Sequence, residues 1–332
     1  MSIATAITNL QGKIANAYTA IENKGGTLPT TQNAENLSAT IDGIPAGSKF
    51  GTTIDEVFHT TTTGDETTLK VFGGVTNLTF DGVTNVSGSG LYYKFNKSGI
   101  TGVSFPALKT LSGISTAEQA FAGCTSLSSV SFPELTTING QAIFKYAFQG
   151  CTSLSSVSFP KLSAIGNNFT NFQYAFQGCT SLSSVSFPEL EIIVGDDTFT
   201  DAFKSCSNMT GLSFPKLKSI SGKKVFGTTW NEMTLASTTV SFPELSAIRN
   251  SGTAATYSTF NFNKNITRFD FPKLTVIAKG SSDTVDALYL FGNCTNLVEI
   301  HFGAENQSII EAASGYASKW GAPSGCQIYF DL

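Results

Sequence analysis

The chain has 332 residues, of which 13% are Asp, Glu, Lys or Arg, and its net charge is −4 at neutral pH. This balance excludes the basic surface that recognises nucleic acid and the polybasic surface that binds anionic membranes. The first residues have neither a basic start nor an unbroken apolar run, so the sequence predicts no signal peptide and no membrane-spanning helix there.

Residues 1–45 predict an α-helical leader. Apolar residues recur in its first half at alternating steps of four and three, which is a heptad seam, and they are Ile3, Ile7, Leu10, Ile14, Ala17 and Ile21. Isolated helices of this length are marginal in water, so we expect a coiled coil in which residues 3–22 associate with other copies of the chain. A single amphipathic helix folded back on the body is the alternative.

Residues 46–70 have strand-like composition interrupted by turn residues. A repeat array exposes an apolar edge at its first coil and needs a cap there, and this segment is the candidate. The sequence therefore divides into a leader, a cap and a repeat region at 71–332.

A Phe-Pro dipeptide preceded by Ser or Asp recurs seven times in the repeat region. Its prolines lie 27 to 29 residues apart, at Pro106, Pro133, Pro160, Pro188, Pro215, Pro243 and Pro272. A fixed period of this length is typical of a solenoid, in which neighbouring coils bury one another's apolar edges. Strand ends in the same register at Phe80, Phe302 and Phe330 bring the prediction to about ten parallel strands.

One repeat shows how each coil is built. Its apolar residues are Leu127, Val130, Phe132, Leu135 and Ile138. Alternation along a strand at 128–132 turns Val130 and Phe132 inward. Because stacked strands lie about 4.8 Å apart, the Phe side chains of successive coils are expected to form an aromatic column. The fold class is therefore α/β, with short helices or turns returning along the convex side.

A second aromatic residue lies eleven positions before the strand Phe in most coils and marks the convex side. It is Phe121, Phe148, Phe176, Phe203, Phe260 and Phe291, with Trp230 displaced by one residue.

The six cysteines are at positions 124, 151, 179, 206, 294 and 326. All of them except Cys326 lie three residues after this aromatic. In other coils this repeat position holds Ser98, Met233 and Asn263, which indicates that the interior accepts a small or adaptable side chain there. We expect free, buried thiols, since repeated side chains point parallel instead of toward each other.

The sequence lacks the parts of a catalytic site. Its two histidines are His59 and His301, and it has no zinc-protease, phosphate-loop or nucleophile-elbow motif. Asp196 and Asp197 are adjacent, which does not supply the separation that a glycosidase needs. We expect no catalytic residue, no metal and no cofactor.

Outward strand positions hold Ser, Thr and Gly in the middle of the array and charges at its C-terminal end. Two longer segments also occur there, at 249–259 and 278–290, and insertions in repeat arrays gather on one edge, often the binding edge. We therefore predict that a ligand binds through Arg249, Arg268, Asp270, Asp283, Asp286, Glu299 and His301. The alternative is that the outward serines bind no ligand and only make this face of the sheet soluble.

Two motifs carry a resemblance to known families. The string Ala-Phe-x-Gly-Cys-Thr-Ser-Leu-x-x-Val-x-Phe-Pro-x-Leu-x-x-Ile is similar to the BspA-like, or treponemal, class of leucine-rich repeat over about 71–332. It departs from that class by Phe-Pro in place of the commoner Leu-Pro and by losing Cys in several coils. The class occurs on bacterial surface antigens and in tailed-phage virion proteins. Residues 1–45 resemble the leader of many phage tail and fibre proteins.

The resemblance implies a leucine-rich-repeat solenoid in a non-enzymatic phage tail fibre or receptor-binding protein of the virion. Its leader would hold it to copies of itself and to other virion tail proteins, and its solenoid would contact a host-surface protein or glycan. One alternative is a tail or baseplate decoration without a specific ligand. The other is a bacterial cell-surface adhesin. None of these implies a nucleic-acid partner or membrane insertion.

Overall fold

A computed structural model of the chain describes residues 17–18, 77–80, 83–88, 90–166, 169–233, 237–249, 258–278, 289–313, 316 and 318–332. The predicted cap at 46–70 lies outside the described residues. So does the predicted leader, except for Ala17 and Tyr18, which are helical, with Tyr18 buried. Self-association through the heptad seam therefore stays a prediction. No helix of the described residues is long and apolar enough to cross a membrane.

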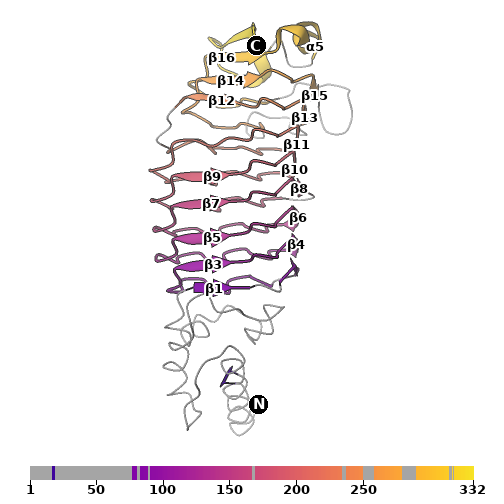
Figure 1. The fold of residues 1–332 in the computed structure, drawn as a ribbon. Coiled ribbons are helices and arrows are strands. Elements are labelled where there is room, and N and C mark those ends of the chain that lie inside the picture. The colour runs from indigo at the N-terminus through magenta and orange to yellow at the C-terminus, as the bar shows by residue number, and fades with distance from the viewer. Residues whose placement is uncertain are drawn as a thin grey trace, which may run out of the picture.

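From Asn77 onward the described chain forms a solenoid whose coils stack along one axis (Figure 1). All strand pairs are parallel and consecutive coils pair in register, as in Val103↔Val130. The first ladder has a five-stranded sheet and a four-stranded sheet. Its strands are β1 (Asn77–Thr79), β3 (Gly102–Ser104), β5 (Ser129–Ser131), β7 (Ser156–Ser158), β9 (Ser184–Ser186), β12 (Thr239–Ser241), β14 (Arg268–Phe271), β16 (Glu299–Phe302) and β17 (Gln327–Phe330).

A second ladder of eight strands runs beside the first, and the sequence analysis did not predict it. Its strands are β2 (Asn85–Val86), β4 (Thr110–Ile114), β6 (Thr137–Gln141), β8 (Ala164–Gly166), β10 (Ile192–Val194), β11 (Ser219–Ser221), β13 (Ala247–Arg249) and β15 (Val276–Ala278). Six of these strands contain the Ile of the Leu-x-x-Ile segment that follows a Pro, for example Ile138 in β6, and Val86 in β2 and Leu111 in β4 hold the same position. The proline ends one strand, and the chain turns directly into another.

The predicted aromatic column is confirmed. Consecutive rings stack from Phe80 to Phe330 with centroids 4.8 to 6.2 Å apart. Every ring before the last is at most 1% exposed, and Phe330 is half-buried. The predicted ten strands become nine in the described residues, because residues 211–213 form no strand although Phe214 keeps its place in the column.

Before residue 304 the described convex side consists of turns and forms a third hydrogen-bonded ladder. In one coil the N–H groups of Ser115, Ala117, Gln119, Phe121 and Gly123 donate to carbonyls of the next coil, at 2.7 to 3.0 Å. Alternate residues such as Ala120 donate within their own coil to the residue three positions earlier. Ser115, Gln119 and Gly123 have positive φ, between 53° and 72°. That conformation costs a non-glycine residue energy, and the hydrogen bonds between coils offset it.

The convex aromatic residues form two stacks instead of one. Phe95, Phe121, Phe148, Phe176 and Phe203 form the first stack. Phe144, Phe172, Phe199, Phe226, Phe260 and Phe291 form the second, four residues earlier in each shared coil. Phe260 and Phe291 therefore lie in a different stack from Phe121, although all three lie eleven residues before a strand Phe. Phe260 stacks on Phe226 at 5.7 Å, and Trp230 packs beside Phe226 at 5.3 Å.

All six cysteines are free and buried, as predicted. Their repeat position is a hydrogen-bond position and not simply a small interior one. Cys151 Sγ donates to the Phe121 carbonyl of the preceding coil at 3.0 Å, and the thiols at 124, 179, 206 and 294 make the equivalent bond. Thr229 Oγ1 and Asn263 Nδ2 supply the donor where Cys is missing, at 3.0 and 2.7 Å. Thr229 therefore takes the role assigned to Met233.

The C-terminal residues cover the convex side of the last coils. They include η2 (Ala304–Asn306), α5 (Gln307–Ala312) and η3 (Lys319–Gly321). Trp320 is fully buried and packs edge-on against Phe302 at 5.8 Å. Its carbonyl accepts the N–H groups of Leu290 and Phe291, so it replaces the carbonyls that a further coil would offer.

Candidate functional site

The C-terminal end of the first ladder brings four of the predicted ligand residues together. In β14, Phe269 and Phe271 are fully buried, so alternation turns Arg268 and Asp270 outward. The parallel register then sets Glu299 of β16 beside Arg268, and His301 beside Asp270. In the middle of the ladder the same outward positions hold exposed serines of β5, β7 and β9.

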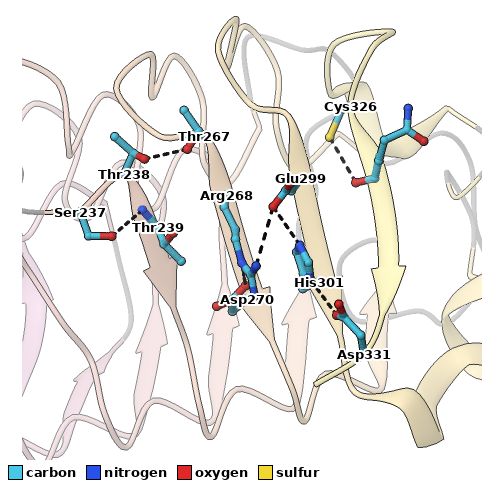
Figure 2. Close-up of polar contacts among 11 residues, drawn as sticks. Ser237, Thr238, Thr239, Thr267, Arg268, Asp270, Glu299, His301, Cys326 and Asp331 are labelled. Carbon is cyan, nitrogen blue, oxygen red and sulfur yellow. Dashed lines mark hydrogen bonds and ion pairs between the residues drawn. The ribbon is translucent and has the colours of Figure 1, made fainter.

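These charged side chains contact one another in an unbroken line (Figure 2). Arg268 Nε lies 2.6 Å from Asp270 Oδ1, and Arg268 Nη1 lies 3.7 Å from Glu299 Oε2. Glu299 Oε2 also lies 3.1 Å from His301 Nε2, whose ring reaches Asp331 Oδ1 through Nδ1 at 2.6 Å. We call Asp270, Arg268, Glu299, His301 and Asp331 the tip network.

His301 is the buried member of the tip network. Its side chain is only 5% exposed because Tyr329 of β17 stacks on the ring, with centroids 4.6 Å apart. Both ring nitrogens face carboxylate oxygens, which are acceptors when ionised. A doubly protonated ring donates to both carboxylates, whereas a neutral ring donates to one. The imidazole therefore ties Asp331, which follows β17, to Glu299 of β16.

The tip network presents negative charge to solvent. The side chains of Asp331 and Glu299 are 55% and 38% exposed, against 31% for Arg268 and 15% for Asp270. Three carboxylates face one guanidinium, so the network is negative in either protonation state of His301. The hydrogen bond from Arg268 to Asp270 raises the pKa of the guanidinium, which keeps it charged. This group of side chains can hold a cationic or hydrogen-bond-donating ligand.

Of the other predicted ligand residues, the structure describes only Arg249, which does not join the tip network. Arg249 lies on β13, in the second ladder, where it pairs in register with Ser221 and Ala278. Asp283 and Asp286 lie outside the described residues. In the part of the chain that the structure describes, no three His, Cys, Asp or Glu side chains are placed to hold a metal ion.

Sequence reasoning missed two residues of this end, Tyr329 and Asp331. Their signal was present, because the last strand was predicted to end at Phe330. Extending the register by one coil puts Tyr329 beside His301, and Asp331 follows the end of that strand.

Comparison with known proteins gives the family. A family model described as BspA type leucine rich repeat region matches six copies, at residues 91–201, 116–251 and 145–313. These matches together span more than half of the chain, and the chain therefore belongs to the BspA type leucine-rich-repeat family. The LRR solenoids of such proteins are typically non-catalytic and mediate binding. No curated protein matches the chain significantly.

Two solved structures are similar to it. A leucine-rich-repeat protein of T. pallidum, TpLRR, is 19% identical and has a TM-score of 0.34; the match covers 77% of this chain and 89% of that one. An internalin, inlF, from Listeria monocytogenes is 12% identical, with a TM-score of 0.28 and coverage of 81% and 71%.

Proposed function

We propose that this protein is a non-enzymatic binding protein whose C-terminal tip holds a host-surface ligand through the tip network. The observation that carries the proposal is the continuous line of charged contacts from Asp270 to Asp331, at one end of a ladder whose middle strands carry exposed serines. Within the tip network, Arg268 and His301 hold the carboxylates in position before any ligand arrives. Such preorganisation lowers the entropy cost of binding.

The ligand class follows from the charge. Exposed carboxylate oxygens of Glu299 and Asp331 accept hydrogen bonds and attract cations. A host-surface protein with basic side chains, or a glycan with amino or hydroxyl groups, offers matching donors. The ring of His301 is too buried to contact a ligand that approaches from solvent. Its role in this proposal is to position Asp331.

The wider setting of the proposal is a tailed-phage virion, in which the protein is a tail fibre or receptor-binding component. Its support is the resemblance of residues 1–45 to phage tail and fibre leaders. The leader would join copies of the chain through residues 3–22 and attach them to other virion tail proteins, leaving the solenoid tip free to meet the host. Mass spectrometry of purified virions from a phage that encodes the chain tests this setting, and its absence from them would contradict it.

The binding proposal is tested with fluorescently labelled protein and a panel of intact bacteria. We expect Glu299→Gln combined with Asp331→Asn to abolish binding while the melting temperature changes little, because both side chains are substantially exposed. The matched control is Glu134→Gln combined with Glu189→Gln, which removes the same charge from exposed ion pairs in the middle of the solenoid. Equal binding by the tip variant and the control would favour a decoration without a ligand.

A further inference from the structure

The outer edge of β17 carries backbone groups that other coils use for pairing. Among the described residues β17 pairs with β16 and with no other strand. In earlier coils the N–H of the column Phe donates to the next strand, as from Phe105 to Ser131 at 2.9 Å and from Phe242 to Asp270 at 3.0 Å. Phe330 holds this position in β17, since it pairs with Phe302. Its N–H, and by alternation the backbone of Ile328, therefore point away from β16.

β17 itself also lacks three features that protect exposed strands. Natural edge strands are blunted by Pro, Lys or bulges, whereas β17 reads Gln-Ile-Tyr-Phe, which favours extended pairing. The convex side of the same end is closed by Trp320. Phe330 has one ring face on Phe302 at 5.8 Å and is only half-buried, unlike the rings before it. One more strand would pair with this edge and cover that ring.

The negative charge at this end of the chain indicates which kind of strand would pair with β17. Residues 299–332 contain four carboxylates and a single lysine, so a tenth of the sequence carries most of the net charge of −4. Asp331, more than half exposed, directly follows β17. A basic strand is attracted to this end, whereas a second copy would bring two acidic ends together.

We propose that β17 binds an extended, basic segment of a protein partner by β-strand addition. The inference rests on the proposed function, because it states how the tip holds its ligand. Strand alternation defines the motif. Apolar side chains of the segment cover Ile328 and Phe330, and the alternate Lys or Arg side chains lie beside Tyr329 and Asp331. Main-chain hydrogen bonds to Phe330 and Ile328 supply affinity, and the acidic tip supplies selectivity.

The test measures fluorescence anisotropy of labelled peptides with the full-length protein. The probe is the acetylated, amidated peptide Ser-Val-Lys-Val-Lys-Val-Ser. We expect it to bind, and to lose affinity in high salt. Replacing its lysines by Glu, or methylating its backbone nitrogens, should each weaken binding by about tenfold or more. Equal binding by the methylated peptide would overturn strand addition, and equal binding by the Glu peptide would overturn the charge argument.

Variants of the protein make the test independent of the peptides. Ile328→Pro removes an N–H that points away from β16, so the β16 pairing persists and peptide binding is lost, whereas Ile328→Val keeps the N–H, the apolar surface and the binding. Asp331→Lys should weaken peptide binding, while Glu118→Lys, the same charge change on the convex side, should not. A dimer of the free protein that Ile328→Pro abolishes would identify a second copy as the occupant and refute the proposal.

The same variants separate this inference from the proposed function. If the Glu299 and Asp331 variant loses bacterial binding while Ile328→Pro retains it, the tip binds its ligand through side chains and the strand-addition inference falls alone. If peptides bind at β17 but no bacterium is bound, the proposed function falls and the edge remains a peptide site.

Discussion

Replacing Phe159 by Ala tests whether the aromatic column carries the stability of the solenoid. Phe159 is fully buried and stacks on Phe132 at 5.7 Å and on Phe187 at 5.2 Å. Two further rings, Phe144 and Phe172, meet it edge-on at 5.8 and 5.5 Å. Its truncation therefore removes the apolar contact of a whole side chain and leaves a cavity between stacked coils, whose backbones cannot collapse without breaking the ladder.

The expected cost is about 4 kcal/mol of unfolding free energy. Burial of a Phe side chain contributes about 1.5–3 kcal/mol, each favourable ring pair adds about 0.5–1.5 kcal/mol, and measured Phe→Ala changes in cores cost about 3–5 kcal/mol. Phe159→Leu keeps most of the volume and loses the ring pairs, so it should cost about 1–2 kcal/mol. Chemical denaturation followed by circular dichroism measures both values.

Ser158→Ala is the matched control, because Ser158 is exposed on the neighbouring position of the same strand. We expect its effect to stay within about 0.5 kcal/mol. The reasoning fails if Phe159→Ala costs no more than Ser158→Ala, since the column would then contribute nothing that a surface residue does not.

Four further outcomes are expected. Deleting residues 1–24 should yield a monomer by light scattering, and a persistent oligomer would contradict the heptad seam. Thr229→Val should cost about 1 kcal/mol in denaturation because the Phe199 carbonyl loses a donor, whereas Thr229→Cys should be nearly neutral. Burial raises the pKa of Cys206 and of Cys294 to about 12, so neither should react with iodoacetamide in the folded protein at pH 8. Unfolded thiols ionise first, so stability should be complete below about pH 8.5 and fall as pH rises toward 12. Ready alkylation would contradict the burial.

The repeat pattern predicted the first ladder and its column because both depend on local periodicity. A Phe at a constant place in a period of 27 to 29 residues must meet its copies once the coils stack, whatever the rest of the coil does. The convex aromatics were harder to assign. The turns of the convex side repeat every four residues, so the ring that Phe260 meets in the preceding coil can be Phe226 instead of Trp230, four residues later, without any change in the strands. Spacing from the strand Phe does not reveal which of the two rings it is.

The tip shows the same division between local pattern and tertiary contact. The amino-acid sequence by itself determined the solenoid, its inward Phe residues and the outward charges at its C-terminal end, because strand alternation and a fixed period are properties of the chain. Only the tertiary structure decided that His301 is buried under Tyr329 and bound to Asp331, that Arg249 lies in another ladder, and that the outer edge of β17 has no strand partner among the described residues. These contacts join residues about 30 positions apart, and their geometry depends on how the coils turn and stack in space.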